Sequence, residues 1–171
     1  MTLINGVKAK YVTAITGGGT AAVSNILSRG GASSWFLEGL IPYAKESLVS
    51  FLGKEPEKFV SERTANQMAL KSYMRAIELG ARPEEAAGLG CTAVLGKVEN
   101  ERAGRLHRAY ISVQTYNRVY LFVEEIPQTA RHDQESWLSE KIEQIICEDD
   151  ISACGPAKET FDQFGLTPLL L

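Results

Sequence analysis

The feature that most constrains the fold is a β-rich apolar run at residues 10–15 that ends at three glycines, residues 17–19. A segment with helical spacing follows at residues 20–28. Glycine allows a tight turn, and the first N–H groups of a helix lack intrahelical partners. The pattern predicts a strand, a turn and a helix, with an anion-binding concavity flanked by Thr16 and Thr20. The same glycines are also compatible with a simple strand-to-helix turn.

Composition predicts one ordinary domain. The 171 residues are 44% hydrophobic and 23% charged, which is enough for a single domain, 1–171, with a real core. The net charge is −3 and no basic strip occurs, so a nucleic-acid partner is not expected. Residues 1–7 lack the charged start and long apolar core typical of a secretory signal, and no run approaches the roughly 20 apolar residues of a membrane span, so neither a leader nor a span is expected. We therefore expect no membrane contact and a cytoplasmic location.

The cysteines and histidines give no sign of a metal site or another cofactor. Cys91, Cys147 and Cys154 form no C-x-x-C pair, and Cys91 lies in an apolar run that indicates a buried packing residue. His107 and His132 have no partner at ligand spacing. We expect neither a metal nor a cofactor.

Strand and helix patterns alternate along the rest of the chain. Strands are expected at 35–41, 86–95, 106–113 and 118–124, the last two forming a hairpin, and helices at 43–52, 62–79 and 134–147. A short helical piece is expected after Pro156, in a C-terminal helical extension over residues 126–171. The apolar tail at 166–171 is expected to dock on the body or on a partner subunit, which suggests a homo-oligomer.

Three smaller patterns add detail to these elements. Ser61 is expected to cap the helix at 62–79. Gly88 and Gly90 imply that something approaches the backbone of their strand closely. Charged positions of the last helix, among them Glu143, are typical of a solvated face.

This order of elements predicts a three-layer α/β/α sandwich. Its sheet would be mixed and mostly parallel, with about five strands, one of them antiparallel. Ligands of such sheets bind at the carboxyl ends of the strands. The loops at 16–20 and 42–45, together with Thr92 and the residues after it, are therefore expected to converge on one pocket.

Over residues 8–125 the sequence resembles the C-terminal domain of the CinA family (competence/damage-inducible protein A). The family patterns A-E-S-C-T-G-G, P-G-S-S and Y-S-N-E-A-K correspond to A-I-T-G-G-G-T from Ala14, G-G-A-S-S from Gly30 and Y-A-K-E-S-L from Tyr43. The family patterns V-S-x-x-x-A-x-x-M-A and G-x-A-V-T-G correspond to S-E-R-T-A-N-Q-M-A from Ser61 and G-L-G-C-T-A from Gly88. The resemblance implies the α/β sandwich already predicted and an amidase acting on nicotinamide mononucleotide.

The resemblance also implies roles for particular residues. Thr16 aligns with the nucleophilic serine and Tyr43 with the family tyrosine, whereas the aligned lysine is replaced by Leu48. Lys45, three residues earlier on the same predicted helix, is a candidate substitute base. The ligand-binding candidates are the cradle and the strand end opposite it: Gly17, Gly18, Gly19, Thr20 and Thr92.

Three functions remain open on these residues. The first is a nicotinamide-nucleotide amidohydrolase in which Thr16 attacks the carboxamide while Tyr43 and Lys45 transfer protons. The second is a catalytically inactive domain that binds a nucleotide or a phosphorylated metabolite. The third is an assembly module, because a fold alone does not decide function.

Overall fold

The computed structural model describes residues 3–4, 7–96, 107–147 and 157–159. The strands are β1 (Leu3–Ile4), β2 (Val7–Lys8), β3 (Lys10–Thr16), β4 (Phe36–Leu40), β5 (Ala86–Ala93), β6 (Arg108–Gln114), β7 (Arg118–Glu125) and β8 (Ala157–Glu159). The helices are α1 (Ala21–Leu27), α2 (Lys45–Leu52), α3 (Glu62–Glu78) and α4 (Arg131–Cys147), with a 3-10 turn η1 at Ala32–Ser34.

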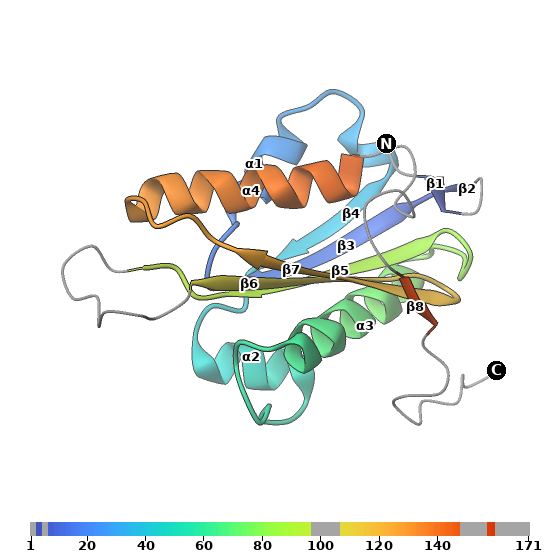
Figure 1. Ribbon diagram of the computed structural model, residues 1–171. Helices are drawn as coiled ribbons and strands as arrows, with labels where there is room; N and C mark the ends of the chain where they lie inside the picture. Colours follow the sequence, from blue (N-terminus) through green and yellow to red (C-terminus); the bar gives the residue numbers. More distant parts are fainter. Residues whose placement is uncertain (1–2, 5–6, 97–106, 148–156, 160–171) are drawn as a thin grey trace.

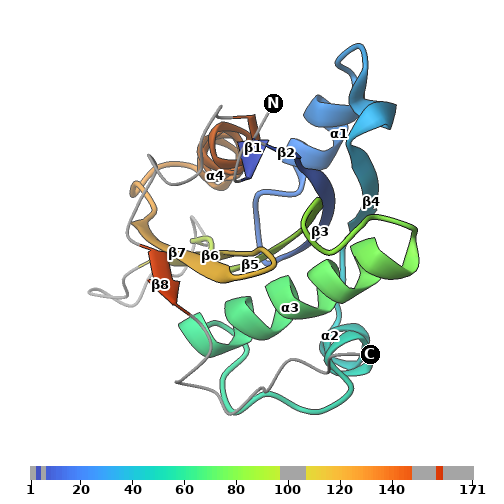
Figure 2. The same ribbon diagram turned by 90° about the vertical axis from the view of Figure 1, so that its right-hand side faces the viewer.

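The predicted three-layer sandwich is confirmed. Six strands form one sheet in the order β4-β3-β5-β6-β7-β8, while β1 and β2 form a small antiparallel pair. Helices α1 and α4 cover one face of the sheet, and α2 and α3 cover the other (Figures 1 and 2). Strand β3 is parallel to both β4 and β5, and β6 runs antiparallel between β5 and β7. Among the five strands expected, β6 is thus the antiparallel one.

Strand β8 is a sixth member of the sheet and corrects the prediction for the C-terminal part. A helical piece was expected after Pro156, but Ala157–Glu159 pairs antiparallel with β7. The outer edge of β7 offers unpaired N–H and C=O groups, and pairing with such an edge overrides a weak local helix signal. The apolar tail predicted to dock, 166–171, lies outside the described residues.

One predicted cap is present, but helix starts differ from the prediction by up to three residues, since α4 begins at Arg131 instead of at Gln134. Ser61 caps α3, its side-chain oxygen accepting a hydrogen bond from the backbone N–H of Thr64 at 3.2 Å. Helix α2 begins at Lys45 rather than at Tyr43, because Ala44 adopts an extended backbone with ψ 151° at the N-cap. Tyr43 therefore lies in the loop between β4 and α2.

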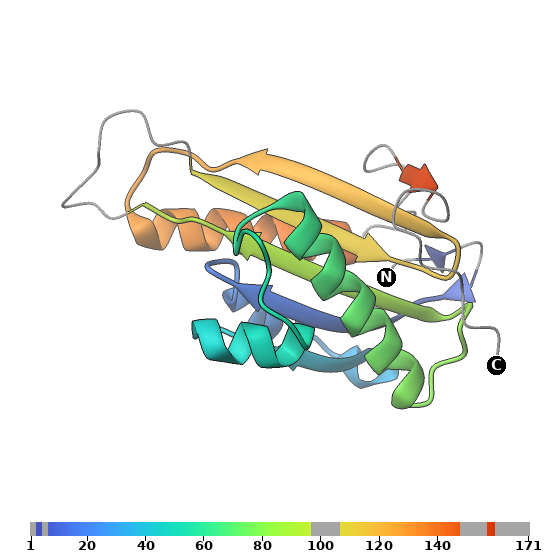
Figure 3. The ribbon, with the colours of Figure 1, turned by 90° about the horizontal axis from the view of Figure 1, so that it is seen from below.

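Helix α3 packs directly on the backbone of β5, as Gly88 and Gly90 predicted. A Cβ atom at Gly88 would lie 2.1 Å from the carbonyl oxygen of Ala69, and one at Gly90 would lie 2.4 Å from that of Ala65. The α3 atoms nearest to these two glycines are backbone atoms, apart from the Cβ of Met68, so the helix and the strand meet backbone to backbone. Figure 3 shows α3 lying across β5.

This contact gives a first testable prediction. We expect Gly90→Ala to lower the free energy of unfolding by about 1–3 kcal/mol, because rigid backbone atoms occupy the space that its methyl group needs. Chemical denaturation of the two proteins measures the difference. Gly30→Ala is the control, since no atom lies within 4 Å of a Cβ built there. Equal stability of the Gly90→Ala and Gly30→Ala variants would contradict this packing.

The face under α1 and α4 holds the larger core. It includes the fully buried Tyr11, Ile15, Leu138 and Ile142, together with the predicted packing residue Cys91. Glu143 corrects the prediction of a solvated face, because its carboxylate is buried. It accepts hydrogen bonds from Asn25 Nδ2 at 2.6 Å and from the guanidinium of Arg29. Helix α1 lies against α4 and supplies Asn25, and Arg29 follows two residues after the end of α1, which makes this burial possible.

Candidate functional site

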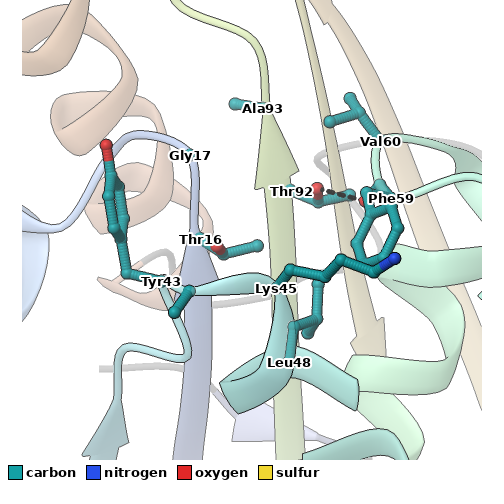
Figure 4. Close-up of a pocket in the computed structure, with 10 residues that line it drawn as sticks. Thr16, Gly17, Tyr43, Lys45, Leu48, Phe59, Val60, Thr92 and Ala93 are labelled. Carbon is teal, nitrogen blue, oxygen red and sulfur yellow. Dashed lines mark hydrogen bonds between the residues drawn. The ribbon is translucent and has the colours of Figure 1, made fainter. Parts of the chain in front are cut away.

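The three loops expected to converge do meet at one pocket. Its volume is about 240 Å³, and it lies where β3 and β5 end and α2 begins (Figure 4). The residues that line it are Thr16, Gly17, Tyr43, Ala44, Lys45, Leu48, Phe59, Val60, Thr92 and Ala93. Of the predicted site residues, the structure brings together Thr16, Gly17, Tyr43, Lys45 and Thr92 here. Gly18, Gly19 and Thr20 do not line the pocket.

The three glycines are required by close packing. Gly17 has φ +83°, and a Cβ there would lie 2.0 Å from the carbonyl oxygen of Ala93. A Cβ at Gly18 would meet the side chain of Leu95 at 2.8 Å, and one at Gly19 would meet that of Ile142 at 2.5 Å. Their surroundings account for all three glycines without a bound ligand.

The donors of the predicted anion cradle bind a carboxylate of the chain itself. Glu135, on α4, accepts hydrogen bonds from the N–H groups of Gly19 at 2.7 Å and Ala21 at 3.2 Å. Its carboxylate also accepts one from the hydroxyl of Thr20 at 2.9 Å. Burial raises the pKa of Glu135, but these hydrogen bonds outweigh burial and hold the pKa below its usual value. The anion at this turn is therefore an internal one.

Two threonine side chains sit side by side at the ends of the parallel strands. Thr16 and Thr92 are register partners of β3 and β5, and both are buried. The Thr92 hydroxyl donates a hydrogen bond of 2.8 Å to the carbonyl oxygen of Phe59, which fixes the segment before α3 against β5. Thr16 presents the second threonine hydroxyl of the pocket (Figure 4).

Lys45 points away from Thr16. Its Nζ atom lies 2.7 Å from Oε1 of Glu55 and 5.4 Å from the ring centre of Phe59. Figure 4 shows the side chain extending toward Phe59. The hydrogen bond to Glu55 raises the pKa of Lys45, so the amine stays protonated. A general base needs the neutral amine, which a lowered pKa would favour.

The other two positions implied by the resemblance also lack catalytic geometry. Leu48, aligned with the family lysine, is only 3% exposed and packs with Ala14, Leu52 and Met68. Tyr43 is 67% exposed, and Figure 4 shows its hydroxyl turned away from Thr16. The pocket thus combines a hydroxyl at position 16 with an apolar floor.

Sequence reasoning missed Phe59, Val60 and Glu55. Phe59 and Val60 line the pocket, and Glu55 pairs with Lys45. A signal for the first two was present: two apolar residues stand directly before the N-cap Ser61, in a position where they must pack on something. No local pattern pointed to Glu55.

The described residues contain no group of three or more His, Cys, Asp or Glu side chains that could hold a metal ion. None of the helices within that part of the chain is long and apolar enough to cross a membrane.

The fold has well-defined structural relatives. A competence/damage inducible protein, CihA, from Agrobacterium tumefaciens superimposes with a TM-score of 0.63 at 16% identity, covering 81% of this chain and 84% of that one. A CinA superfamily protein from Enterobacter cloacae gives 0.62 at 14% identity over 84% and 83% of the two chains. This chain has the CinA fold. A competence or damage-inducible protein from Enterobacter asburiae, with a TM-score of 0.61 and 14% identity over 81% and 86%, shares the CinA fold as well.

No protein-family model matches the sequence, and no curated protein matches it. The likeness to CinA proteins therefore concerns the fold, and the chemistry of the pocket has to be argued from its own residues.

Proposed function

We propose that this chain is a CinA-like domain that binds a small metabolite of the pyridine-nucleotide class without hydrolysing it. The observation that carries the proposal is the position of Lys45. Its ammonium group is paired with Glu55 on the side of the pocket away from Thr16, and Leu48 stands at the position of the family lysine. A hydroxyl without a base is a weak nucleophile, so the pocket supports recognition rather than amide cleavage.

The lining is suited to one flat, partly polar group. Phe59, Leu48 and Val60 supply apolar surface, and Thr16 supplies a hydrogen-bonding hydroxyl beside it. The volume of about 240 Å³ is below the roughly 300–1,000 Å³ of typical small-molecule pockets. The pocket therefore accommodates one part of a nucleotide, such as its base, while the rest lies at the rim. Nicotinamide mononucleotide is the probe that the CinA resemblance suggests.

The test combines binding and turnover of this probe on the purified protein. We expect calorimetry to detect binding of nicotinamide mononucleotide, while an ammonia assay over the same period detects no release. Ala44→Phe should weaken binding at least tenfold, because Ala44 lines the pocket, is exposed and can carry a ring into it without disturbing the core. Ser47→Phe is the control, on an exposed position of α2 that does not line the pocket.

Three results would contradict the proposal. Absence of binding, or equal binding by the Ala44→Phe and Ser47→Phe variants, would remove the pocket as a site for this ligand. Ammonia release by the wild type that disappears in Thr16→Ala would instead establish an amidohydrolase with Thr16 as nucleophile.

A further inference from the structure

We propose that Glu55 occupies the place of an anionic group of the ligand, and that such a group displaces it to pair with Lys45. This inference rests on the proposed function and specifies the ligand as one that carries a phosphate or carboxylate at the rim of the pocket. Of the ten described residues that line the pocket, only Lys45 carries a charge at neutral pH. Electrostatic selection among ligands at this pocket therefore depends on what Lys45 binds.

The ion pair can be exchanged at little energetic expense. The side chains of Lys45 and Glu55 are 57% and 60% exposed, so both groups remain hydrated and screened when they pair. Exposed ion pairs contribute little to stability, and breaking one does not leave a buried charge behind. A ligand anion that gains additional contacts with the pocket can therefore replace Glu55 on Lys45.

The ammonium group keeps its place when Glu55 leaves. The Nζ atom lies 5.4 Å from the centre of the Phe59 ring, within the range of a cation–π contact. Phe59 is itself fixed, because its carbonyl oxygen accepts the hydrogen bond of Thr92 from β5. Glu55 has no comparable attachment among the described contacts of its side chain. When a ligand anion replaces the carboxylate of Glu55, the ammonium group of Lys45 thus stays at the rim of the pocket.

The arrangement predicts opposite effects for the two partners of the pair. Removing the charge of Glu55 removes a competitor, so Glu55→Gln should bind nicotinamide mononucleotide about three- to tenfold more tightly than the wild type. Lys45→Met should bind it at least tenfold more weakly. Nicotinamide riboside lacks the phosphate and keeps only the positive charge of the pyridinium ring, so it should bind neither more tightly to Glu55→Gln nor more weakly to Lys45→Met than to the wild type. Calorimetry at fixed ionic strength measures each dissociation constant.

Glu57→Gln is the matched control for charge. Glu57 is in the same segment, its side chain is 77% exposed, and it pairs with Arg63 rather than with a pocket residue. A gain in affinity for the mononucleotide in Glu57→Gln equal to that in Glu55→Gln would show a general effect of net charge and overturn the inference. An unchanged affinity in Glu55→Gln, or an equal change for the riboside, would overturn it too.

A second measurement is independent of the nucleotide. Titration with inorganic phosphate should shift the NMR signals of the Lys45 ε-methylene group, more strongly in Glu55→Gln than in the wild type. No shift in either protein would reject an anion site at Lys45. A shift of this kind without binding of nicotinamide mononucleotide would support the anion site while rejecting the ligand class proposed above.

Discussion

Glu135→Ala is expected to lower the free energy of unfolding by about 2–4 kcal/mol, with no direct change at the pocket. The substitution removes the acceptor of three hydrogen bonds, from the N–H groups of Gly19 and Ala21 and from the hydroxyl of Thr20. The donors lie at the turn between β3 and α1, and Glu135 makes the hydrogen bonds that attach α4 to that turn. Glu135→Gln should lower the free energy of unfolding by less. The oxygen of the glutamine amide can still accept a hydrogen bond, whereas its NH₂ group takes the place of the other carboxylate oxygen and faces a donor.

The effect of Glu135 should also depend on pH in a defined direction. The pKa of Glu135 is lower in the folded protein than its usual value, so ionisation favours the folded state. The contribution of the ionised Glu135 to stability is present in full above the pKa of glutamate in the unfolded chain, about 4.3. It is lost as the pH falls through the lower pKa of Glu135 in the folded protein. The stability difference between the wild type and Glu135→Gln should therefore be constant near neutral pH and shrink below about pH 4.

Chemical denaturation of the wild type, Glu135→Ala and Glu135→Gln at pH 7 and at pH 3–4 measures these differences. Glu140→Ala is the control, at an exposed position of α4. A loss as large in Glu140→Ala, or a difference that grows toward acid pH, would contradict the role assigned to Glu135.

The layers of the fold followed from periodicity in the sequence. The apolar run before the glycines, the continuous run of small apolar residues in β5 and the two strand patterns around a short polar connection in β6 and β7 each formed the expected element. The pocket followed from the same information, because parallel strands bring their carboxyl ends together. Strand β8 was not predicted, because a strand of three residues that pairs with the open edge of β7 leaves no periodic pattern in the sequence.

The hydrogen bonds that fix the two glutamates of α4 join residues that lie far apart in the sequence. Glu135 and Gly19 are separated by 116 positions, and Glu143 meets Asn25 across 118. Helical periodicity within 134–147 sorts apolar from polar positions, but it does not reveal that α1 lies against α4. It therefore assigned Glu143 to solvent and gave no role to Glu135. The missing information is the direction in which α4 packs.

Lys45 illustrates the same limit within the site. Its spacing from position 48 allowed it to reach the region of the family lysine, and it does line the pocket. Its actual direction is set by Glu55 and by the ring of Phe59, both in a segment without regular structure. Sequence spacing thus located the residue correctly but did not determine which way its amine points.

The double variant Thr16→Ser with Leu48→Lys is expected to release ammonia from nicotinamide mononucleotide at least about 10²-fold faster than the wild type. Thr16 and Leu48 line the same pocket, so the substitutions bring a less hindered hydroxyl and an amine to its floor. Leu48 is 3% exposed, and burial lowers the pKa of a lysine introduced there, which favours the neutral amine that accepts a proton.

The matched control is Thr16→Ser with Leu48→Met, which keeps the serine and a side chain of similar length but provides no amine. Circular dichroism and a thermal melt on both double variants establish that they fold, because a lysine at this buried position lowers stability. Ammonia release by the lysine variant alone would mean that the pocket retains the geometry for amide cleavage and lacks only its base. If both variants fold and bind the nucleotide yet release nothing, the loss of a base does not explain the inactivity, and the orientation of Tyr43 becomes the next feature to change.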